Sequence, residues 1–434
     1  MKGMLAKKRE ESNRKESFLE ATIKLFLSIM GRINFLSLER YGKLNEKSYR
    51  NNFENGFDFL KYNKKMIKER ELKNPIIVGD ASFIRKSGKK TPGLDIFWSG
   101  KDSLAKKGLE IHTLAVVDTK TKEAYHLQTQ QTVLPTEIYY DKKFDLTKEE
   151  IGTKKKKIGK KNSEPLRRTE LYTKNPMYSY LKQIILNSKE LLEISKYFVY
   201  DAFAYKKDFL DPIIEAGFEV ISKARKDANL RYLYTGKQKE GRGRKKRYDG
   251  KIDWKIPELN RFTKEEYMEK DVEVHSIIAN AQHLKRDLKL AYIINKKTSK
   301  SIILYSTDLK LSAQEIIEGY KARFQIEFLF RDAKQFTGLE DCQSRSLEKL
   351  NYHFNTSLTA VSVAKFDFYQ KEENLDKPFS MHNIKVANYN NLVADFIFSN
   401  SEIPQSSNLI TKIHDQLSHF GHIYGIKDDK ICEL

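Results

Sequence analysis

Two short apolar segments that each end in an aspartate constrain the fold of this chain most strongly. Residues 75–80 read Pro-Ile-Ile-Val-Gly-Asp, and residues 196–201 read Lys-Tyr-Phe-Val-Tyr-Asp. Short runs rich in β-branched and aromatic side chains are typical of buried strands. A carboxylate at the end of a buried strand is costly to desolvate unless it is paired or binds a metal ion. Asp80 and Asp201 are therefore candidate functional residues.

The segments around these two runs predict a mixed α/β core. Three further strands, linked by short turns as in an antiparallel meander, are expected at residues 94–98, 109–118 and 122–129. After a helix at residues 175–193, the second run is followed by a helix at 206–216 and a strand at 218–222. A strand, a helix and a strand in this order form a right-handed β-α-β unit.

A long helix is the most informative predicted element. Ser312 and Glu315 form a capping-box signature, and Gly338 is placed to end the helix. The predicted helix spans about 25 residues and presents four side chains within an arc of about 60°. The four are Tyr320, Arg323, Glu327 and Lys334, and Arg331 extends the same face. This face is either a ladder of ion pairs exposed to solvent or a functional surface.

The two strand-end aspartates favour the functional interpretation. Together with Glu327 they supply three carboxylates on separate elements of one core, with no cysteine or histidine cluster. Such oxygen donors suit Mg2+, with Mn2+ as a substitute. Two ions bound by Asp80, Asp201 and Glu327 would activate a water or a 3′-hydroxyl for attack on a phosphodiester. Arg323 and Lys334 would then hold phosphates beside the scissile bond.

Residues 223–300 interrupt the alternation of strands and helices with a long insertion of β character. Between Ser222 and Ile256 there are 13 lysine and arginine residues against four acidic ones, a net charge of +9. Basic side chains interleaved with tyrosine and tryptophan suit a nucleic-acid backbone with stacking positions, although a charged hairpin tip would have a similar sequence. The predicted DNA contacts in this insertion are Arg242, Arg244, Lys245, Lys246, Arg247 and Trp254.

The whole chain of 434 residues is basic. Lysine and arginine total 80 against 59 aspartate and glutamate, which gives a net charge of +21. A surplus of this size favours a polyanionic partner, although a lysine-rich codon usage produces the same surplus. A lysine-rich loop at residues 150–169 is a further candidate contact to phosphates or, equally, a solvated surface.

The composition also indicates a cellular location. Cys342 and Cys432 are the only cysteines, too few for a disulfide framework and suited to a reducing cytosol. No apolar stretch approaches the roughly 18 residues needed to span a bilayer, and no export signal is evident. We therefore expect a cytoplasmic protein with no membrane partner. We expect the remaining candidate metal ligands, His414, His419 and His422, to be surface or core residues.

Both ends of the chain are expected to be helical. Residues 17–72 read as short helices, including one at residues 45–60, and form either a DNA-binding module or a helical cap on the core. Residues 346–434 also look helical and carry an apolar face. That face serves either dimerisation or simple packing on the core.

Three acids and a four-residue signature resemble those of the DDE transposases of bacterial insertion sequences, specifically the IS-four family with its YREK motif. The acids are Asp80, Asp201 and Glu327, and the signature consists of Tyr320, Arg323, Glu327 and Lys334. The resemblance covers about residues 74–345. It implies an RNase H-like core whose first strand carries Asp80, whose fourth strand carries Asp201 and whose later helix carries Glu327.

The fold class that follows is α/β, an RNase H-like mixed-sheet catalytic core interrupted by a β-rich insertion, with helical N- and C-terminal regions. The resemblance suggests five segments along the chain. They are a helical DNA-binding region (1–73), the first part of the core (74–222), the insertion (223–300), the second part of the core with the glutamate helix (301–345) and a helical region for dimerisation (346–434).

The resemblance also implies an activity. In this family a homodimer bound to two element ends nicks double-stranded DNA by hydrolysis, forms hairpins with the freed 3′-hydroxyl, reopens them and joins the ends to target DNA. Tyr320 would act with Arg323 and Lys334 as a contact to the DNA phosphates near the cleaved terminus. An aromatic residue of the insertion would stack a flipped base, and Trp254, Tyr248 and Tyr292 are all candidates.

We therefore expect a Mg2+-dependent, nucleoid-associated transposase that moves an insertion sequence by cut-and-paste transposition. Two alternatives remain. An RNase H-fold DNA endonuclease without strand transfer would use the same three acids. A non-catalytic DNA-binding protein derived from a transposase would be favoured by losing buried negative charge near phosphates, so the presence of all three acids counts against it.

Overall fold

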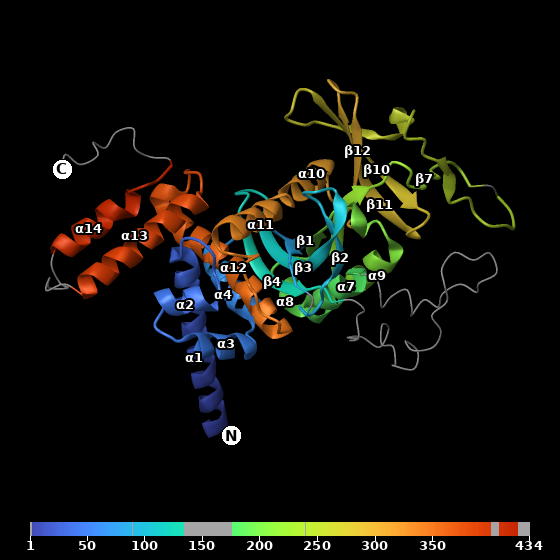
Figure 1. Cartoon of the computed structure of the whole chain (residues 1–434). Coiled ribbons are helices and arrows are strands. Elements are labelled where there is room, and N and C mark those ends of the chain that lie inside the picture. The colour runs from blue at the N-terminus through green and yellow to red at the C-terminus, as the bar shows by residue number, and fades with distance from the viewer. Residues whose placement is uncertain (1, 89, 134–175, 239, 401–407, 424–434) are drawn as a thin grey trace, which may run out of the picture.

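The computed structural model describes residues 2–88, 90–133, 176–238, 240–400 and 408–423, and the predicted loop at residues 150–169 lies outside these ranges (Figure 1). Its central feature is a twelve-stranded mixed sheet. The strands are β1 (Pro75–Arg85), β2 (Asp95–Ser99), β3 (Leu104–Asp118), β4 (Ala124–Gln131), β5 (Tyr197–Val199), β6 (Glu219–Ala224), β7 (Leu230–Leu233), β8 (Tyr248–Lys251), β9 (Thr263–Glu265), β10 (Val272–Ala281), β11 (Arg286–Asn295) and β12 (Ser301–Ser306).

Helices pack on both faces of this sheet and form both ends of the chain (Figure 1). They are α1 (Lys2–Ser28), α2 (Phe35–Tyr41), α3 (Glu46–Glu54), α4 (Phe59–Arg70), α7 (Pro176–Leu186), α8 (Ser188–Leu192), α9 (Lys207–Glu215), α10 (Ala313–Ala322), α11 (Gln325–Phe336), α12 (Leu347–Tyr369), α13 (Met381–Ser399) and α14 (Asn408–His419). Short 3-10 helices are η1 (Ala202–Ala204), η2 (Leu259–Arg261) and η3 (Glu372–Asn374).

The strand order is β2-β3-β1-β5-β6-β12-β11-β10-β7-β8, with β4 paired to β3 and β9 paired to β10. Strand β1 runs antiparallel to β3 over its whole length and parallel to β5, and β5 runs parallel to β6. Helix α9 connects β5 to β6, as expected for a β-α-β unit. These observations confirm the predicted α/β fold class, with a large mixed sheet consistent with an RNase H-like core and with helical ends.

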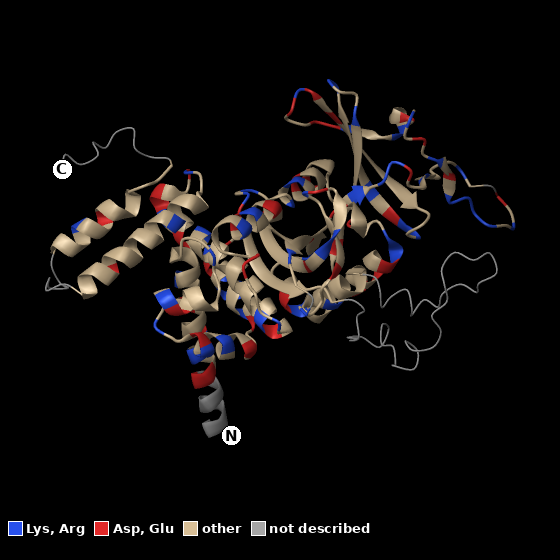
Figure 2. Cartoon of the chain, viewed as in Figure 1, with Lys and Arg blue, Asp and Glu red and all other residues tan. Residues whose placement is uncertain are grey.

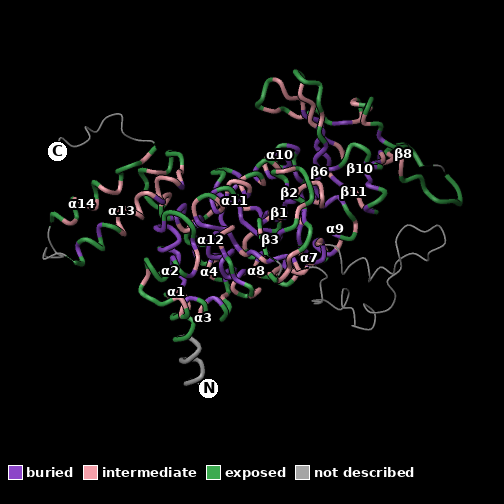
Figure 3. Tube along the Cα trace, viewed as in Figure 1, coloured by how far each residue is buried: buried purple, intermediate pink, exposed green. Residues whose placement is uncertain are grey.

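The alternation of side chains along β1 explains why helices cover both faces of the sheet. Ile76 and Val78 belong to one buried cluster, which also contains apolar side chains of α1, α10, α11 and α12. Ile77 belongs to a second cluster, formed with α7 and α9 on the opposite face. Figure 3 shows the buried residues concentrated where the sheet and these helices overlap. A strand buried on both faces reads as a continuous apolar run, which is the pattern in the sequence.

The β-rich insertion extends the same sheet rather than packing as a detached layer. Strand β12 pairs antiparallel with β6, and β11 and β10 follow it in order. Beyond β10 the short strands β7, β8 and β9 form the far end of the sheet, on the right of Figure 1.

The predicted single helix at residues 312–338 is wrong in one respect, because the structure contains two helices. The capping box at Ser312 is present, but α10 ends at Ala322 and α11 begins at Gln325. At the junction the amide of Phe324 donates to the carbonyl of Lys321, and the amide of Glu327 donates to the carbonyl of Phe324. These bonds span three residues instead of four, so a tighter 3-10 turn interrupts the α-helix.

Two other predicted helices are also divided. The helix expected at residues 45–60 starts as predicted, with the Asn45 side chain accepting from the amide of Ser48. It ends at Glu54, because Gly56 has a φ of 60° that lies outside the helical region. The helix expected at residues 175–193 is α7 followed by α8, with Asn187 between them. Among the described residues, no helix is both long and apolar enough to cross a membrane.

A buried lysine joins the C-terminal helices to α1. Lys385 of α13 is 5% exposed, and its Nζ donates to the carbonyl of Phe26 at 2.6 Å. That carbonyl lies in the last turn of α1, where carbonyl groups lack helical partners. Burial lowers the pKa of Lys385 to about 7, and the nearby Asp341 acts in the opposite direction.

We predict that Lys385→Met removes a pH-dependent component of stability. An unfolded lysine has a pKa near 10.4, so between pH 7 and pH 10 the unfolded chain binds more protons than the folded chain. The free energy of unfolding of the wild type should therefore rise by about 4 kcal/mol over this range from this group alone. Urea unfolding at several pH values should show this rise to be lost in Lys385→Met and retained in the exposed-site control Lys43→Met. Equal slopes in both variants would contradict the assignment.

Candidate active site

The two predicted aspartates lie at the same level, one within β1 and the other just beyond the end of the adjacent strand β5. The parallel pairing of β1 with β5 aligns Val78 with Val199, and the same offset brings Asp80 level with Asp201. Asp80 lies within β1, which continues to Arg85. Asp201 follows β5, the fifth strand in chain order, and caps η1 by accepting a hydrogen bond from the amide of Phe203 at 3.0 Å. The resemblance implies a fourth strand before this aspartate, whereas the structure has a fifth, because the short strand β2 precedes β3.

A close contact sets the approach of these two strands. A Cβ atom added to Gly79 would lie 2.8 Å from Cε2 of Tyr200 and 3.0 Å from Cζ of Phe198. Only glycine therefore fits between Val78 and Asp80 with the neighbouring strand in this position. The Tyr200 and Phe198 rings therefore pack directly over Gly79, beside Asp80 and Asp201 in the chain.

Asp80 lies in an unfavourable electrostatic position. Its side chain is 21% exposed. The pKa of Asp80 is raised to about 7, chiefly by burial. The Arg323 guanidinium lowers this pKa, whereas the negative charges of Asp201 and Glu327 act in the same direction as burial. The three predicted acids therefore interact electrostatically, and the charged form of Asp80 depends on a neighbouring cation.

Arg323 is that cation. Its Nη1 lies 3.6 Å from Oδ2 of Asp80, and its Nη2 lies 3.4 Å from Oε1 of Glu327. The arginine side chain is 15% exposed, and its Nε is buried without a hydrogen-bond partner among the described residues. Arg323 thus links a strand acid to the helix acid, from the junction between α10 and α11.

Tyr320 lies beside this group in the last turn of α10. The Cζ of Arg323 is 5.9 Å from the centre of the Tyr320 ring. Burial raises the pKa of Tyr320, and the negative charge of Asp201 contributes in the same direction. The structure therefore brings Tyr320, Arg323 and Glu327 toward the strand aspartates, although they do not stand on one straight helix.

Lys334 and Arg331 occupy different surroundings on α11. The Nζ of Lys334 donates to the carbonyl of Phe83 at 2.8 Å and lies 3.7 Å from Oε1 of Glu340. Lys334 therefore contacts β1 three residues beyond Asp80. Arg331 instead pairs with Asp332 at 2.9 Å and is 54% exposed. The structure does not bring Arg331 into contact with the three acids.

A polar layer that the sequence analysis missed lies under the strand acids. The hydroxyl of Tyr180 donates to Oε1 of Glu110 at 2.5 Å. His112 stacks on the Tyr180 ring at 4.4 Å between ring centres, and its Nδ1 lies 2.7 Å from Oε1 of Gln183. Burial raises the pKa of Tyr180 far above its ordinary value, and Glu110 and Asp80 are among the charges that reinforce the shift. The sequence pattern that could have predicted this layer is the alternation of Glu110 and His112 with apolar residues at 109–118.

The basic side chains of the insertion follow the loop between β7 and β8, which Figure 2 shows as a blue segment at the right edge. Arg242, Arg244 and Lys245 are exposed, as are Arg247 and Lys246. Lys246 forms an ion pair with Asp249 at 2.6 Å.

Trp254 of the same insertion has a packing role. Its ring lies 5.2 Å from that of Tyr292 and 6.3 Å from that of Phe262, measured between ring centres. Its Nε1 is buried without a hydrogen-bond partner among the described residues. Tyr248 also has a contact within the protein, because the Cζ of Arg231 lies 3.8 Å from the centre of its ring.

The three acids fit a hard cation by their chemistry. Within the described ranges, no group of three or more acidic, histidine or cysteine side chains is arranged to hold a metal ion. The arrangement has a physical reason, because the Arg323 guanidinium stands between Asp80 and Glu327. The raised pKa of Asp80 and the all-oxygen donor set show what a divalent cation would relieve, namely repulsion among neighbouring carboxylates.

Comparison with known proteins covers part of this site. No curated protein matches the chain. Residues 179–362 match the family described as the transposase DDE domain, a segment that contains Asp201 and the α10–α11 pair with Glu327. The match supports a DDE transposase, and such a transposase binds DNA.

Proposed function

We propose that this chain is a Mg2+-dependent DNA transposase that moves an insertion sequence by cut-and-paste transposition, as members of the IS-four family with a YREK motif do. One observation carries the proposal. Arg323 lies within ion-pair distance of both Asp80 and Glu327, while Asp80 stands level with Asp201 on the neighbouring parallel strand. Two of the three acids, on separate elements, thus share one partly buried cation, and the third stands beside them.

Asp80, Asp201 and Glu327 would hold two Mg2+ ions, with Mn2+ as a possible substitute. Divalent ions held there supply Lewis acidity to the attacking water or 3′-hydroxyl and to the departing oxygen. The chain itself positions the donors. Asp80 and Asp201 come from neighbouring strands, and Glu327 follows the turn between α10 and α11.

The cations beside the acids would bind the scissile phosphate. A guanidinium offers parallel N–H groups that match two phosphate oxygens, so Arg323 can exchange carboxylates for phosphate as DNA enters. Tyr320 would donate its hydroxyl to a neighbouring phosphate. Lys334, held by Phe83 and Glu340, would neutralise a phosphate further along β1. Exposed cations of the β7–β8 loop would contact the element end farther from the three acids.

The same proposal includes a hairpin intermediate with a stacked base. Trp254, Tyr248 and Tyr292 are the candidate stacking residues. Trp254 and Tyr292 pack against each other in the aromatic cluster of the insertion. Tyr248 is half-buried beside Arg231. A base would therefore have to stack on the outward face of one of these rings.

We also propose that the active form is a homodimer assembled through the C-terminal helices. Helices α13 and α14 lie against each other and project from the rest of the molecule, on the left of Figure 1. They expose several large apolar side chains, including Phe396 at 71%, Ile397 at 55% and Leu409 at 54%. A contiguous exposed apolar surface is typical of a protein–protein interface.

An endonuclease without strand transfer is the second candidate function. It would use the same acids, so only the detection of joined products separates the two activities. A non-catalytic DNA-binding protein is the third. The electrostatic strain at Asp80 disfavours it, because binding alone would not retain a desolvated carboxylate beside two others.

We predict that Asp80→Asn, Asp201→Asn and Glu327→Gln each abolish cleavage of element-end DNA in Mg2+ while leaving DNA binding measurable. The rate should fall by more than about 100-fold, since loss of an outer-shell partner alone typically reduces metal affinity or activity 10- to 100-fold. Cleavage is followed on labelled duplexes carrying the inverted repeats that flank the gene. The exposed Asp376→Asn serves as control and should cleave normally. Intact cleavage in any of the three variants would place the active site elsewhere.

We predict that Phe396→Glu together with Ile397→Glu keeps the protein monomeric in its complex with element-end DNA. A charged side chain in an apolar interface is strongly unfavourable because it must be desolvated. Light scattering coupled to gel filtration measures the molar mass of the complex. Leu375→Glu, at an exposed apolar site outside α13 and α14, should form the same complex as the wild type. A dimer in the double variant would show that another surface joins the subunits.

A further inference from the structure

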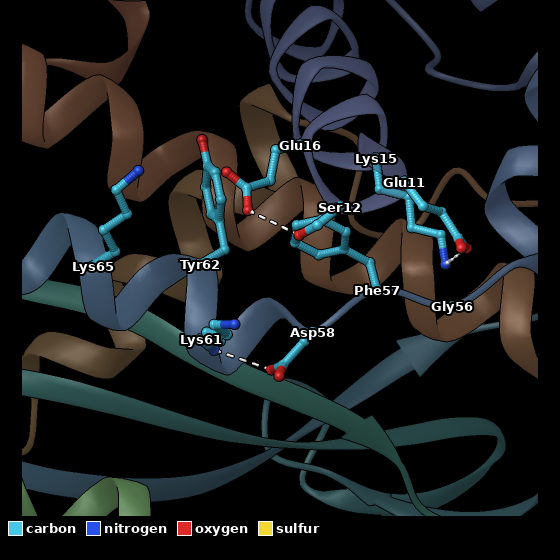
Figure 4. Close-up of a pocket in the computed structure, with 10 residues that line it drawn as sticks. All are labelled: Glu11, Ser12, Lys15, Glu16, Gly56, Phe57, Asp58, Lys61, Tyr62 and Lys65. Atoms are coloured by element: carbon cyan, nitrogen blue, oxygen red, sulfur yellow. Dashed lines mark hydrogen bonds and ion pairs between the residues drawn. The ribbon is translucent and has the colours of Figure 1, made fainter. Parts of the chain in front are cut away.

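Two hollows in the surface differ sharply in charge. One, of about 610 Å3, lies between α1 and the start of α4 (Figure 4). It is lined by equal numbers of acidic and basic side chains, which are Glu11, Glu16, Asp58, Lys15, Lys61 and Lys65. Figure 4 shows Glu11 paired with Lys15, and these charges therefore compensate one another. This hollow indicates no charged ligand.

The second hollow, of about 1040 Å3, is strongly basic. We call it the hairpin groove, because residues of β1, of the β2–β3 hairpin and of the segment after α11 line it. Eight lysine and arginine residues face three acidic ones there. The basic residues are Arg32, Arg85, Lys86, Lys90, Lys101, Lys106, Lys107 and Arg345.

Several of these cations lack compensation within the protein. Arg85, Lys101 and Lys107 are exposed and have no ion-pair partner among the described residues. Lys106 in contrast pairs with Asp102 at 2.9 Å, and Lys86 donates to the carbonyl of Cys342. Like charges gathered in one groove repel each other, and a polyanion relieves that repulsion.

The groove begins next to the candidate active site. Phe83 and Arg85 line it and lie three and five residues beyond Asp80 on β1, on the opposite face of the strand from Asp80. At about 3.3 Å per residue, they stand roughly 10 to 17 Å from Asp80 along the strand. This distance corresponds to about three to five base pairs of duplex at 3.4 Å each. Lys334, which binds the Phe83 carbonyl, bridges the acids and the groove.

The lining chemistry indicates which DNA would bind. Lysine and arginine dominate it, and such residues at a duplex mainly contact phosphates, which carry no sequence information. Under the proposed function an element end must be recognised by its sequence, so a groove that contacts phosphates suits instead the duplex into which that end is inserted. We propose that the hairpin groove holds target DNA by its phosphate backbone. This inference rests on the proposed transposase function.

An exposed tryptophan stands beside the groove. Trp98 of β2 is 62% exposed, and Ile96 two residues before it is 66% exposed. Ile96 pairs with Lys107 of the groove, so alternation places Trp98 and Lys107 on the same face of the hairpin. The chain has only two tryptophans, and the other, Trp254, lies in the insertion. Trp98 can therefore report directly on DNA at this hairpin.

The first experiment measures binding of a labelled duplex of arbitrary sequence, without divalent cations, over a range of salt concentrations. The slope of log affinity against log salt changes by about one for each phosphate-binding side chain that is removed. The triple variant Arg85→Gln, Lys101→Gln and Lys107→Gln should lower that slope by about 3. A matched triple variant at exposed lysines elsewhere, Lys189→Gln, Lys371→Gln and Lys377→Gln, should retain the wild-type slope. An unchanged slope in the groove variant overturns the proposal.

The second experiment locates the bound DNA. In a Trp254→Phe background, saturating duplex of arbitrary sequence should quench the fluorescence of Trp98, and an unchanged emission overturns the placement of DNA at the hairpin.

The third experiment separates the groove from the proposed catalysis. The groove variant should cleave element-end DNA at the wild-type rate yet yield at least 10-fold fewer joined products. Equal loss of cleavage and joining would show that the groove holds the element end instead, which also overturns the proposal. If the wild type cleaves nothing, the proposed function fails, while the salt-slope and fluorescence results still decide whether the groove binds DNA.

Discussion

The candidate site depends on the parallel pairing of β1 with β5. This pairing places two carboxylates at one level of a sheet that helices cover on both faces, where little water screens their repulsion. The approach is close because Gly79 admits the Tyr200 ring. A third acid could join them only with a cation in place, and Arg323 provides it. The helices above the sheet must therefore place both Arg323 and Glu327 beside the strand acids.

The break between α10 and α11 allows both residues to reach the strand acids. Helix α10 packs over β6, β11 and β12, whereas α11 packs over β1, β3 and β4. Neighbouring strands of a sheet are rotated relative to one another, so one straight helix cannot follow both halves of it. The 3-10 turn at residues 323–324 divides the helix between these two sets of strands. Arg323 consequently lies where the two halves meet.

Local patterns in the sequence predicted the strands and the acids, but not the features that depend on the whole sheet. The apolar runs before Asp80 and Asp201 are local, and so is the capping box at Ser312, which the structure confirms. The sequence has no proline or glycine at the position of the helix break, so no residue there predicts the break. The hairpin groove was missed for a related reason, since its cations come from segments that only folding brings together.

The separation of charges links these features to the chemistry of DNA. The positive charges behind the net charge of +21 are not spread evenly around the acids. Among the described residues, the one cation within ion-pair distance of both Asp80 and Glu327 is the partly buried Arg323. Exposed cations stand instead along the continuation of β1 and in the β7–β8 loop. A phosphate backbone held at those outer positions is drawn toward acids that would otherwise repel it. Arg323 can then serve in turn as the counter-ion of the free carboxylates and as a ligand of the phosphate that reaches them.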